Sequence, residues 1–181
     1  KWDSLSANQV TKVSQLEGYD GYILGIDFRP DGKILATTSA DKTVVLWDIS
    51  DPTFPKKLEA AFTNSTMFSQ VAFHPNGQVL AFAGEDKQIT LWDIQDMSHP
   101  IKLDILDGFE EYMESLEFSP DGNILAGADR TNLILWDIKD LKNIKKLSST
   151  KFAIPLQEIA FHPNEPLLAI HIYQQVQFLD I

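Results

Sequence analysis

The sequence contains no cysteine, and this absence removes several kinds of chemistry at once. Such a chain forms no disulfide framework, holds no metal through thiolates and offers no thiol nucleophile. A protein without disulfides suits a reducing compartment. We therefore expect a cytoplasmic protein.

Long apolar runs and positive charge are also scarce. No run reaches the roughly 18 apolar residues of a membrane span, and the start of the chain, KWDSLSANQV, has no signal-peptide core. The 15 basic and 26 acidic residues leave a net charge of −11, spread along the chain. This charge repels nucleic-acid phosphates and anionic lipid, so we expect neither nucleic acid nor membrane as a partner. Because the chain does not begin with Met, we expect it to be an excerpt or a processed chain.

Motifs that carry catalysis or cofactors are absent from the sequence. It has no G-x-S-x-G, no phosphate-binding glycine loop and no H-E-x-x-H. Its histidines occupy different slots and do not form a zinc-like set: two precede a turn proline, one is in a loop and one is on a strand (His74, His162, His99 and His171). Acidic pairs such as Glu110-Glu111 are interpreted as solvated loop charges. We expect no catalytic residue, no metal and no cofactor.

Two marks recur along the chain at nearly the same interval. The first is LWDI, which occurs three times and ends the chain in the altered form FLDI (46–49, 91–94, 135–138 and 178–181). The second is a phenylalanine followed by a proline turn, read as FRPDG, FHPNG, FSPDG and FHPNE (from Phe28, Phe73, Phe118 and Phe161). A shared period of about 45 residues indicates one supersecondary unit repeated along the chain.

Each unit is predicted to be a small antiparallel sheet. Around the first marks the chain alternates as half-buried strands do, over 22–28, 33–39 and 43–49. In the Pro-Asp-Gly turn, proline presets φ and glycine takes the left-handed exit of a short hairpin loop. A fourth, lysine-bearing strand follows each LWDI (55–62, 100–106 and 143–149), and lysine blunts an exposed sheet edge. The predicted fold is therefore all-β.

These motifs resemble those of the WD-repeat β-propellers. The order F-x-P-D-G, L-A, D-K-T and L-W-D-I matches that family over nearly the whole chain. The spacers DISDPTFPKKL and DIQDMSHPIKL are most similar to the WD arrays of large bacterial signalling proteins. The resemblance implies four-stranded blades around a central channel, usually about seven, and a non-enzymatic scaffold or sensing module that binds a protein or peptide. The alternative is a regulatory or substrate-recognition propeller of a larger multidomain enzyme or nucleotide-switch signalling protein.

The resemblance also assigns structural residues. Family blades often share a hydrogen-bond chain from the Trp indole through a Ser or Thr and the His of a Gly-His pair to a turn Asp. The residues that match these roles lie in three blades (Thr37, Asp41 and Trp47; Asp86 and Trp92; Trp136). The His slot holds Tyr19, Asn64, Phe109 and Phe152, so we expect no blade to build the complete network and apolar packing between blades to dominate. The expected packing residues recur at fixed slots (Leu35, Leu46, Phe73, Leu80, Phe118, Leu125 and Phe161).

The family's partner-binding positions lie on one rim of the channel. Carried over slot by slot, they give a candidate rim of eleven residues: Tyr22, Leu24, Ala40, Met67, Ser69, Glu85, Tyr112, Glu114, Asp129, Pro155 and Gln157. Tyr22, Met67 and Tyr112 are amphipathic anchors of the kind that carries interface energy. The acidic members favour a basic partner.

The frame of the repeat bears on ring closure. We expect four units, approximately 4–49, 50–94, 95–138 and 139–181, each opening with the strand that follows the previous LWDI. In this frame Trp2-Asp3 ends a third strand, residues 10–16 form a fourth strand, and Ile181 ends a third strand. Four such blades are expected to make about half a ring, completed by further blades of a parent chain or by a second copy of this one.

Overall fold

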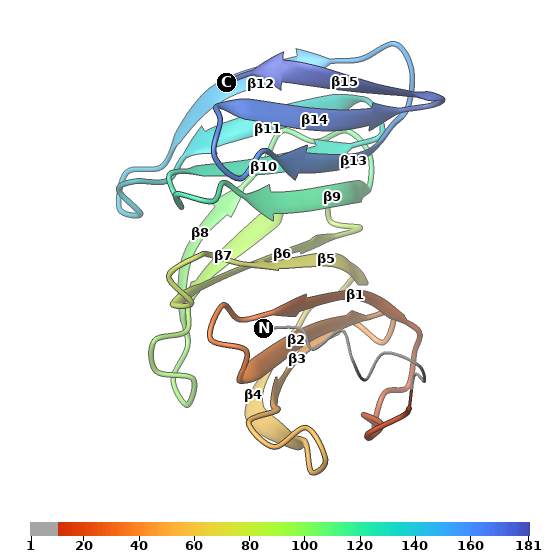
Figure 1. Ribbon diagram of the computed structural model, residues 1–181, viewed down its shortest axis with the longest axis vertical. Coiled ribbons are helices and arrows are strands. Elements are labelled where there is room, and N and C mark those ends of the chain that lie inside the picture. Colours follow the sequence, from red (N-terminus) through yellow and green to blue (C-terminus); the bar gives the residue numbers. More distant parts are fainter. Residues whose placement is uncertain (1–10) are drawn as a thin grey trace, which may run out of the picture.

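The computed structural model describes residues 11–181, and no helix occurs in that span. Figure 1 shows four antiparallel sheets stacked in chain order as an open arc, with the first and fourth sheets at opposite ends. The all-β prediction of four propeller blades is confirmed. No helix of the described part could cross a membrane.

The sheets follow the predicted repeat closely. The first sheet contains β1 (Ile23–Phe28), β2 (Ile34–Ser39), β3 (Thr43–Asp48) and β4 (Lys56–Thr63) in that order. The second contains β5 (Phe68–Phe73), β6 (Val79–Gly84), β7 (Ile89–Asp93) and β8 (Ile101–Leu106). The third contains β9 (Met113–Phe118), β10 (Ile124–Asp129), β11 (Asn132–Asp137) and β12 (Lys145–Lys151). The fourth has only β13 (Leu156–Phe161), β14 (Leu167–Ile172) and β15 (Gln175–Asp180).

The proline turns have the backbone that their sequence predicts. Gly32, Gly77 and Gly122 adopt φ values of 69°, 71° and 73°. Glycine reaches this left-handed region without a Cβ penalty, which is why it ends these hairpin loops. The fourth turn has Glu165 at the corresponding position and closes differently, with the Leu167 amide donating to the Glu165 carbonyl at 2.7 Å. The fourth unit therefore differs from the other three in its turn, and it also lacks their tryptophan.

The core lies between the sheets rather than within one of them. Three apolar clusters each join one sheet to the next, so the two faces of a blade belong to different clusters. Leu46 packs toward the second sheet, whereas Trp136 packs back against it from the third. The strand alternation inside LWDI thus supplies both faces of a blade. Of the predicted packing residues, five are buried (Leu46, Phe73, Leu80, Phe118 and Leu125).

Leu35 and Phe161 are only half-buried, which corrects the expectation for these two slots. Leu35 belongs to the face of the first sheet that no other described sheet covers, because burial of this slot requires a preceding blade. Phe161 packs on the third cluster from its edge.

Polar contacts between inner strands hold neighbouring blades together. The Asp27 carboxylate accepts the Phe73 amide at 2.6 Å, and the Glu117 carboxylate accepts the Phe161 amide at 2.9 Å. Both acids occupy the same slot of their strands, two units apart. Burial raises the pKa of Asp27, opposed by the amide bonds, and burial also raises the pKa of Glu117.

The arc is open at both ends. In the fourth sheet β15 has no outer neighbour among residues 11–181. The expected strand over 10–16 is wrong for residues 11–16, which are not in a strand, because a strand exists only where a neighbour completes its hydrogen-bond ladder. Val10 and the expected third-strand end at Trp2-Asp3 lie outside the described residues.

Candidate functional site

The candidate rim is formed where each inner strand begins and where the second strand turns into the third. A backbone hydrogen bond holds these two segments together in each of the first two blades. The Ala40 amide donates to the Tyr22 carbonyl at 2.9 Å, and the Glu85 amide donates to the Met67 carbonyl at 3.0 Å. In this way Tyr22 lies beside Ala40, and Met67 lies beside Glu85.

The exposure of the candidate residues varies widely. Tyr22 is 85% exposed and Tyr112 is 56% exposed, so both rings are available to a partner. The other exposed members are Leu24, Glu114, Pro155 and Gln157, and the half-buried ones are Ala40, Met67, Ser69 and Glu85. The structure therefore leaves the two aromatic anchors exposed, whereas the third anchor, Met67, is half-buried.

Asp129 does not belong to an exposed rim, and its assignment there is corrected. Its side chain is fully buried and accepts the backbone amides of Glu110 and Glu111 at 2.8 and 3.1 Å. It also accepts the amides of Thr131 and Asn132, at 2.7 and 2.6 Å. Burial opposes ionisation of Asp129, but these hydrogen bonds outweigh it and lower its pKa. Asp129 has the role in its blade that Asp41 and Asp86 have in theirs. Its position in the repeat is shifted because the turn of the third blade is one residue shorter.

Ser69 links two blades rather than standing free on the rim. Its hydroxyl donates to the Met113 carbonyl of the third sheet at 3.1 Å. The neighbouring Gln70 side chain donates to the Glu114 carbonyl at 2.9 Å. Together these bonds fix the second and third parts of the rim relative to one another.

The first blade builds a hydrogen-bond chain that the sequence did not predict. The Trp47 indole donates to the Tyr19 hydroxyl at 2.5 Å, and that hydroxyl contacts Thr37 Oγ1 at 2.6 Å. Thr37 in turn donates to the Val45 carbonyl at 3.3 Å, so Tyr19 is the donor toward Thr37. Tyr19 thus replaces the family histidine between Trp47 and Thr37, and burial raises its pKa. The signal was present in the sequence, since a tyrosine hydroxyl can both donate and accept.

Asp41 anchors the loop that carries Tyr19. Its carboxylate accepts the Asp20 amide at 3.0 Å and the Thr43 amide at 3.0 Å. This fixes the segment immediately before Tyr22, whose ring is 85% exposed.

The second and third blades keep only parts of this chain, as expected. In the second, Asn64 donates to Asp86 at 2.6 Å, but the buried indole nitrogen of Trp92 has no hydrogen-bond partner within residues 11–181. In the third, Phe109 packs against Trp136 with ring centroids 5.6 Å apart. The rim loops are therefore positioned by a different device in each blade.

Charges of both signs lie around the rim. Arg130 is 3.9 Å from the Glu114 carboxylate, and Lys151 pairs with Glu110 at 2.7 Å. Lys87 also reaches from the second blade to the Glu110 carbonyl. The acidic excess expected at the rim is therefore partly neutralised by this chain's own side chains.

The histidines make different contacts and do not form a metal site. No group of three potential metal ligands occurs within residues 11–181. His74 was interpreted as an ordinary turn residue, but it connects two blades. Its Nδ1 accepts the Asn76 amide at 3.0 Å, so Nε2 carries the hydrogen and donates to the Gly122 carbonyl at 2.9 Å.

Ile154, which is 51% exposed beside Pro155, is a further rim side chain that the slot-by-slot reasoning missed.

Radially repeated four-stranded antiparallel sheets with their cores between the sheets define a β-propeller segment. The family model described as "WD domain, G-beta repeat" matches residues 10–48, 56–93 and 102–137, which is more than half of the chain. The chain belongs to the WD-repeat family.

Curated relatives match short parts of the chain. Protein hir1 of Schizosaccharomyces pombe is 34% identical over 56 residues, which are 31% of this chain and 6% of that protein. Lissencephaly-1 homolog 1 of Paramecium tetraurelia is 35% identical over 51 residues, which are 28% of this chain and 13% of that protein. Small ribosomal subunit protein RACK1y of Oryza sativa subsp. japonica is 37% identical over 57 residues, which are 31% of this chain and 17% of that protein. The matched part is thus a small fraction of each relative's length. Together with the family, these likenesses support the role of a protein-interaction scaffold.

Proposed function

We propose that this segment binds a protein or peptide through the rim where its inner strands begin, with Tyr22 and Tyr112 as anchors. The observation that carries the proposal is the exposure of these two rings, 85% and 56%, on loops that the structure holds in place. Large aromatic side chains presented on rigid loops supply contact area at low entropic cost and are enriched among energetically dominant interface residues. The positions come from the family's partner-binding slots.

The supporting side chains extend the surface along the arc. Leu24 lies beyond Tyr22, Glu114 beyond Tyr112, and Gln157 beyond Pro155, and all are exposed. Half-buried Met67 and Glu85 lie on the second blade between the two tyrosines. Because Met is flexible and polarisable, Met67 adapts to a partner side chain.

A basic partner suits this surface best. The chain carries a net charge of −11, and charge complementarity speeds encounter and discriminates against acidic proteins. Arg130 and Lys151 reduce this preference locally, so the preference is expected to be modest. We place the protein in the cytoplasm and assign it no catalytic step of its own. In the second candidate function, the same rim positions a substrate or regulator for an enzyme in the same polypeptide.

Partner capture tests the rim directly. Replacing Tyr22, Met67 and Tyr112 together with alanine should abolish capture of a partner identified with the wild-type chain. The two tyrosine replacements should lower the melting temperature by only a few degrees, because exposed substitutions cost about 0.5 kcal/mol or less each, and the replacement of half-buried Met67 should lower it somewhat further. The matched control replaces Phe54, Ile101 and Leu147, which are 74%, 63% and 53% exposed away from the rim slots. Equal loss of capture in the control set, or collapse of the fold in the rim set, would contradict the proposal.

A further inference from the structure

The four blades are of two kinds, and the two kinds alternate along the chain. The end of the inner strand and its turn read IDFRPDG in the first blade and LEFSPDG in the third, with an acid before the phenylalanine. The same segment reads VAFHPNG in the second blade and IAFHPNE in the fourth, with alanine before the phenylalanine and histidine after it. Two kinds of blade in alternation make two kinds of junction.

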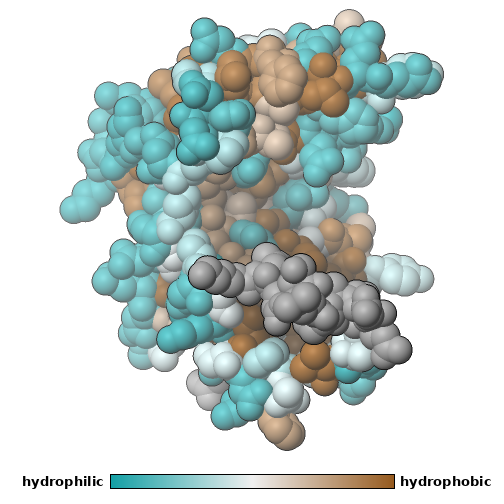
Figure 2. Space-filling view, viewed as in Figure 1, coloured by the Kyte–Doolittle hydropathy of each residue, from teal (hydrophilic) through white to brown (hydrophobic). Residues whose placement is uncertain are grey.

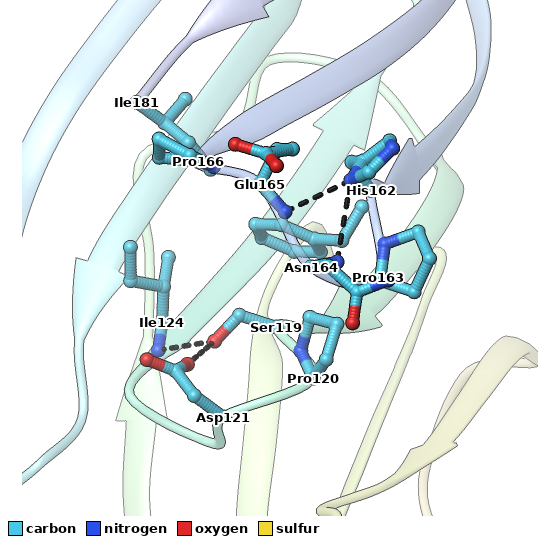
Figure 3. A pocket seen from close by; sticks show the side chains of 11 residues that line it. Ser119, Pro120, Asp121, Ile124, His162, Pro163, Asn164, Glu165, Pro166 and Ile181 are labelled. Atoms are coloured by element: carbon cyan, nitrogen blue, oxygen red, sulfur yellow. Dashed lines mark hydrogen bonds between the residues drawn. The ribbon is translucent and has the colours of Figure 1, made fainter.

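The first and third junctions, between blades one and two and between blades three and four, are of one kind. In each, an acid of the earlier blade accepts a phenylalanine amide of the later blade, Asp27 from Phe73 at 2.6 Å and Glu117 from Phe161 at 2.9 Å. Each also has a cavity between its two proline turns, of about 540 Å³ at the first junction and 320 Å³ at the third. Figure 3 shows the cavity of the third junction.

The second junction, between blades two and three, is of the other kind. Ala72 replaces the acid, and His74 makes the polar contact between the turns. The Nδ1 atom of His74 accepts the Asn76 amide of its own turn at 3.0 Å, and Nε2 donates to the Gly122 carbonyl of the next turn at 2.9 Å. The ring lies so close that a Cβ at Gly122 would be 2.5 Å from it. A histidine in this slot therefore fits a turn glycine on the following blade.

The fourth blade has this histidine, and it is exposed. The Nδ1 atom of His162 accepts the Asn164 and Glu165 amides of its own turn at 3.2 and 2.8 Å, as Figure 3 shows. The Nε2 atom therefore carries the hydrogen, as in His74, and it has no acceptor within residues 11–181. His74 is half-buried by the third blade, whereas His162 is exposed. The fourth blade thus presents an oriented donor.

The first blade has the matching glycine, and it is also exposed. Gly32 has a φ of 69°, close to the 73° of Gly122. Nothing lies within 4 Å of the point where its Cβ would be, and its carbonyl accepts no hydrogen bond within residues 11–181. Gly122 is buried under His74, whereas Gly32 is exposed. The turn of the first blade can therefore receive a histidine in the way that the third turn does.

The apolar face of the fourth blade corresponds to a face that is covered at the second junction. Val176 and Phe178 on β15 are 62% and 69% exposed. They occupy the slots of Ile89 and Leu91 on β7, which are fully buried. The fourth blade therefore exposes the apolar side chains that the second blade buries against the third.

The apolar face of the first blade corresponds to the other side of the same junction. Ile26 and Phe28 on β1 are 63% and 57% exposed. They occupy the slots of Leu116 and Phe118 on β9, which are 7% and 5% exposed because they lie against the second blade. The exposed faces of blades four and one are thus the two halves of a junction of the second kind.

We infer that the fourth blade of one copy of this chain docks head to tail on the first blade of a second copy, as the second blade docks on the third. His162 of one copy donates to the Gly32 carbonyl of the other, and the two apolar faces cover each other. Glu158 occupies the slot of Gln70, so the bond from Gln70 to the Glu114 carbonyl is not repeated. The histidine bond is therefore the polar contact that selects this pairing.

Blocking opposite ends in two separate chains tests the pairing. Ile26→Glu places a charge on the face of the first blade, and Phe178→Glu places one on the face of the fourth. In sedimentation velocity each variant alone should have the 20.4 kDa mass of one chain, because every possible junction then lacks one apolar face. An equimolar mixture should form a one-to-one complex, since the fourth blade of the Ile26→Glu chain meets the first blade of the Phe178→Glu chain. Self-association of either variant alone, or no complex in the mixture, would overturn the inference.

A second measurement addresses the histidine. His162→Asn keeps an oxygen for the turn amides but is too short to reach Gly32. Added to the Ile26→Glu chain, it should weaken the mixed complex about two- to tenfold, the usual effect of losing one hydrogen bond. In the chain without other changes it should weaken self-association as well, which keeps the test available if Ile26→Glu does not fold. The control is His99→Asn, at a side chain that is 85% exposed in a loop, and it should change nothing. Unchanged association in His162→Asn would overturn the inference.

Discussion

At the residue scale, single substitutions in a repeated slot decide how each blade is held. The His slot of the polar network holds Tyr19 in the first blade, Asn64 in the second and Phe109 in the third. Tyr19 restores the link between Trp47 and Thr37, Asn64 keeps only the link to Asp86, and Phe109 replaces hydrogen bonding with ring packing. Decay of the family motif therefore changes the type of contact in each blade while the sheet itself persists.

Replacing Tyr19 with phenylalanine tests this link. The Trp47 indole would lose its acceptor while its ring stays buried, and an unsatisfied buried donor costs about 1–3 kcal/mol. Thermal denaturation should show a melting temperature lower by several degrees. Tyr22→Phe removes an exposed hydroxyl and should leave the melting temperature unchanged. Equal stability of both variants would mean that the Tyr19 chain contributes nothing.

Replacing Glu117 with glutamine tests the cost of ionising a half-buried acid. Burial raises the pKa of Glu117, and the nearby Glu158 and Asp27 carboxylates add to the rise, against the Phe161 amide bond. A raised folded-state pKa means that stability is fullest below the unfolded-state pKa, about 4, and is lost as the pH rises through the folded-state pKa. Glutamine keeps an acceptor for the Phe161 amide without the charge.

The Glu117→Gln variant should therefore melt at a higher temperature than the wild type at pH 7. The difference should shrink as the pH falls toward 4, where Glu117 becomes protonated in both folded and unfolded chains. Glu114→Gln, at an exposed rim position, provides the control. A variant that is less stable at pH 7 would show that the charged hydrogen bond outweighs the desolvation.

At the scale of the element, the proline turns both close a hairpin and contact the next blade. Gly32 and Gly122 share the left-handed backbone, with φ of 69° and 73°, but differ in their surroundings. A Cβ at Gly32 would meet nothing within 4 Å, whereas a Cβ at Gly122 would lie 2.5 Å from the His74 ring. Position 122 therefore requires glycine for two reasons, its left-handed backbone and the close approach of the His74 ring.

Alanine at these two glycines separates the two requirements. Gly32→Ala should cost about 1 kcal/mol, the strain of a left-handed alanine. Gly122→Ala should cost more, because His74 must also leave the Gly122 carbonyl. Denaturant unfolding measures both, and adding His74→Ala to Gly122→Ala should recover part of the excess. Equal costs for the two single variants would show that the contact between blades is unimportant.

At the scale of the whole molecule, both ends of the arc expose apolar side chains. Ile26 and Phe28 of the first sheet are 63% and 57% exposed, and Val176 and Phe178 of the fourth are 62% and 69% exposed. Figure 2 shows apolar surface at the fourth-sheet end of the molecule. Phe28 is in the slot of Phe73, and Phe178 is in the slot of Leu135, residues that are buried where blades meet. We therefore propose that both end faces contact another blade.

Light scattering on the 181-residue chain tests these faces. The mass should exceed the 20.4 kDa of one chain, since exposed apolar faces of this kind associate. A clean dimer would indicate a two-copy ring, and larger aggregates would indicate that blades of a parent chain normally cover the faces. Phe178→Glu should lower the apparent mass, whereas Phe54→Glu, in an exposed loop, should not. A stable 20.4 kDa monomer would refute the idea of a half ring.

The sequence by itself determined the repeat, the strands and the turns. Alternation such as TVVLWDI and the Pro-Asp-Gly loop are local, since a strand's faces and a turn's φ angles depend on neighbouring residues. Predicted strands over 22–28 and 43–49 became Ile23–Phe28 and Thr43–Asp48. Local chemistry therefore predicted the strands and turns of each sheet, whereas the arrangement of the sheets as propeller blades was predicted from the family resemblance.

Only the tertiary structure decided which side chains meet, both within a blade and across a blade junction. Asp129 is buried beneath backbone amides, Tyr19 stands in for a histidine, and Ser69 donates to the Met113 carbonyl of the next blade. Each depends on how a segment meets another some 20 to 45 residues away, where small differences of length and size accumulate. A repeat period specifies equivalent positions in each blade, but a contact between blades depends on both side chains, and in this chain those pairs differ from one junction to the next.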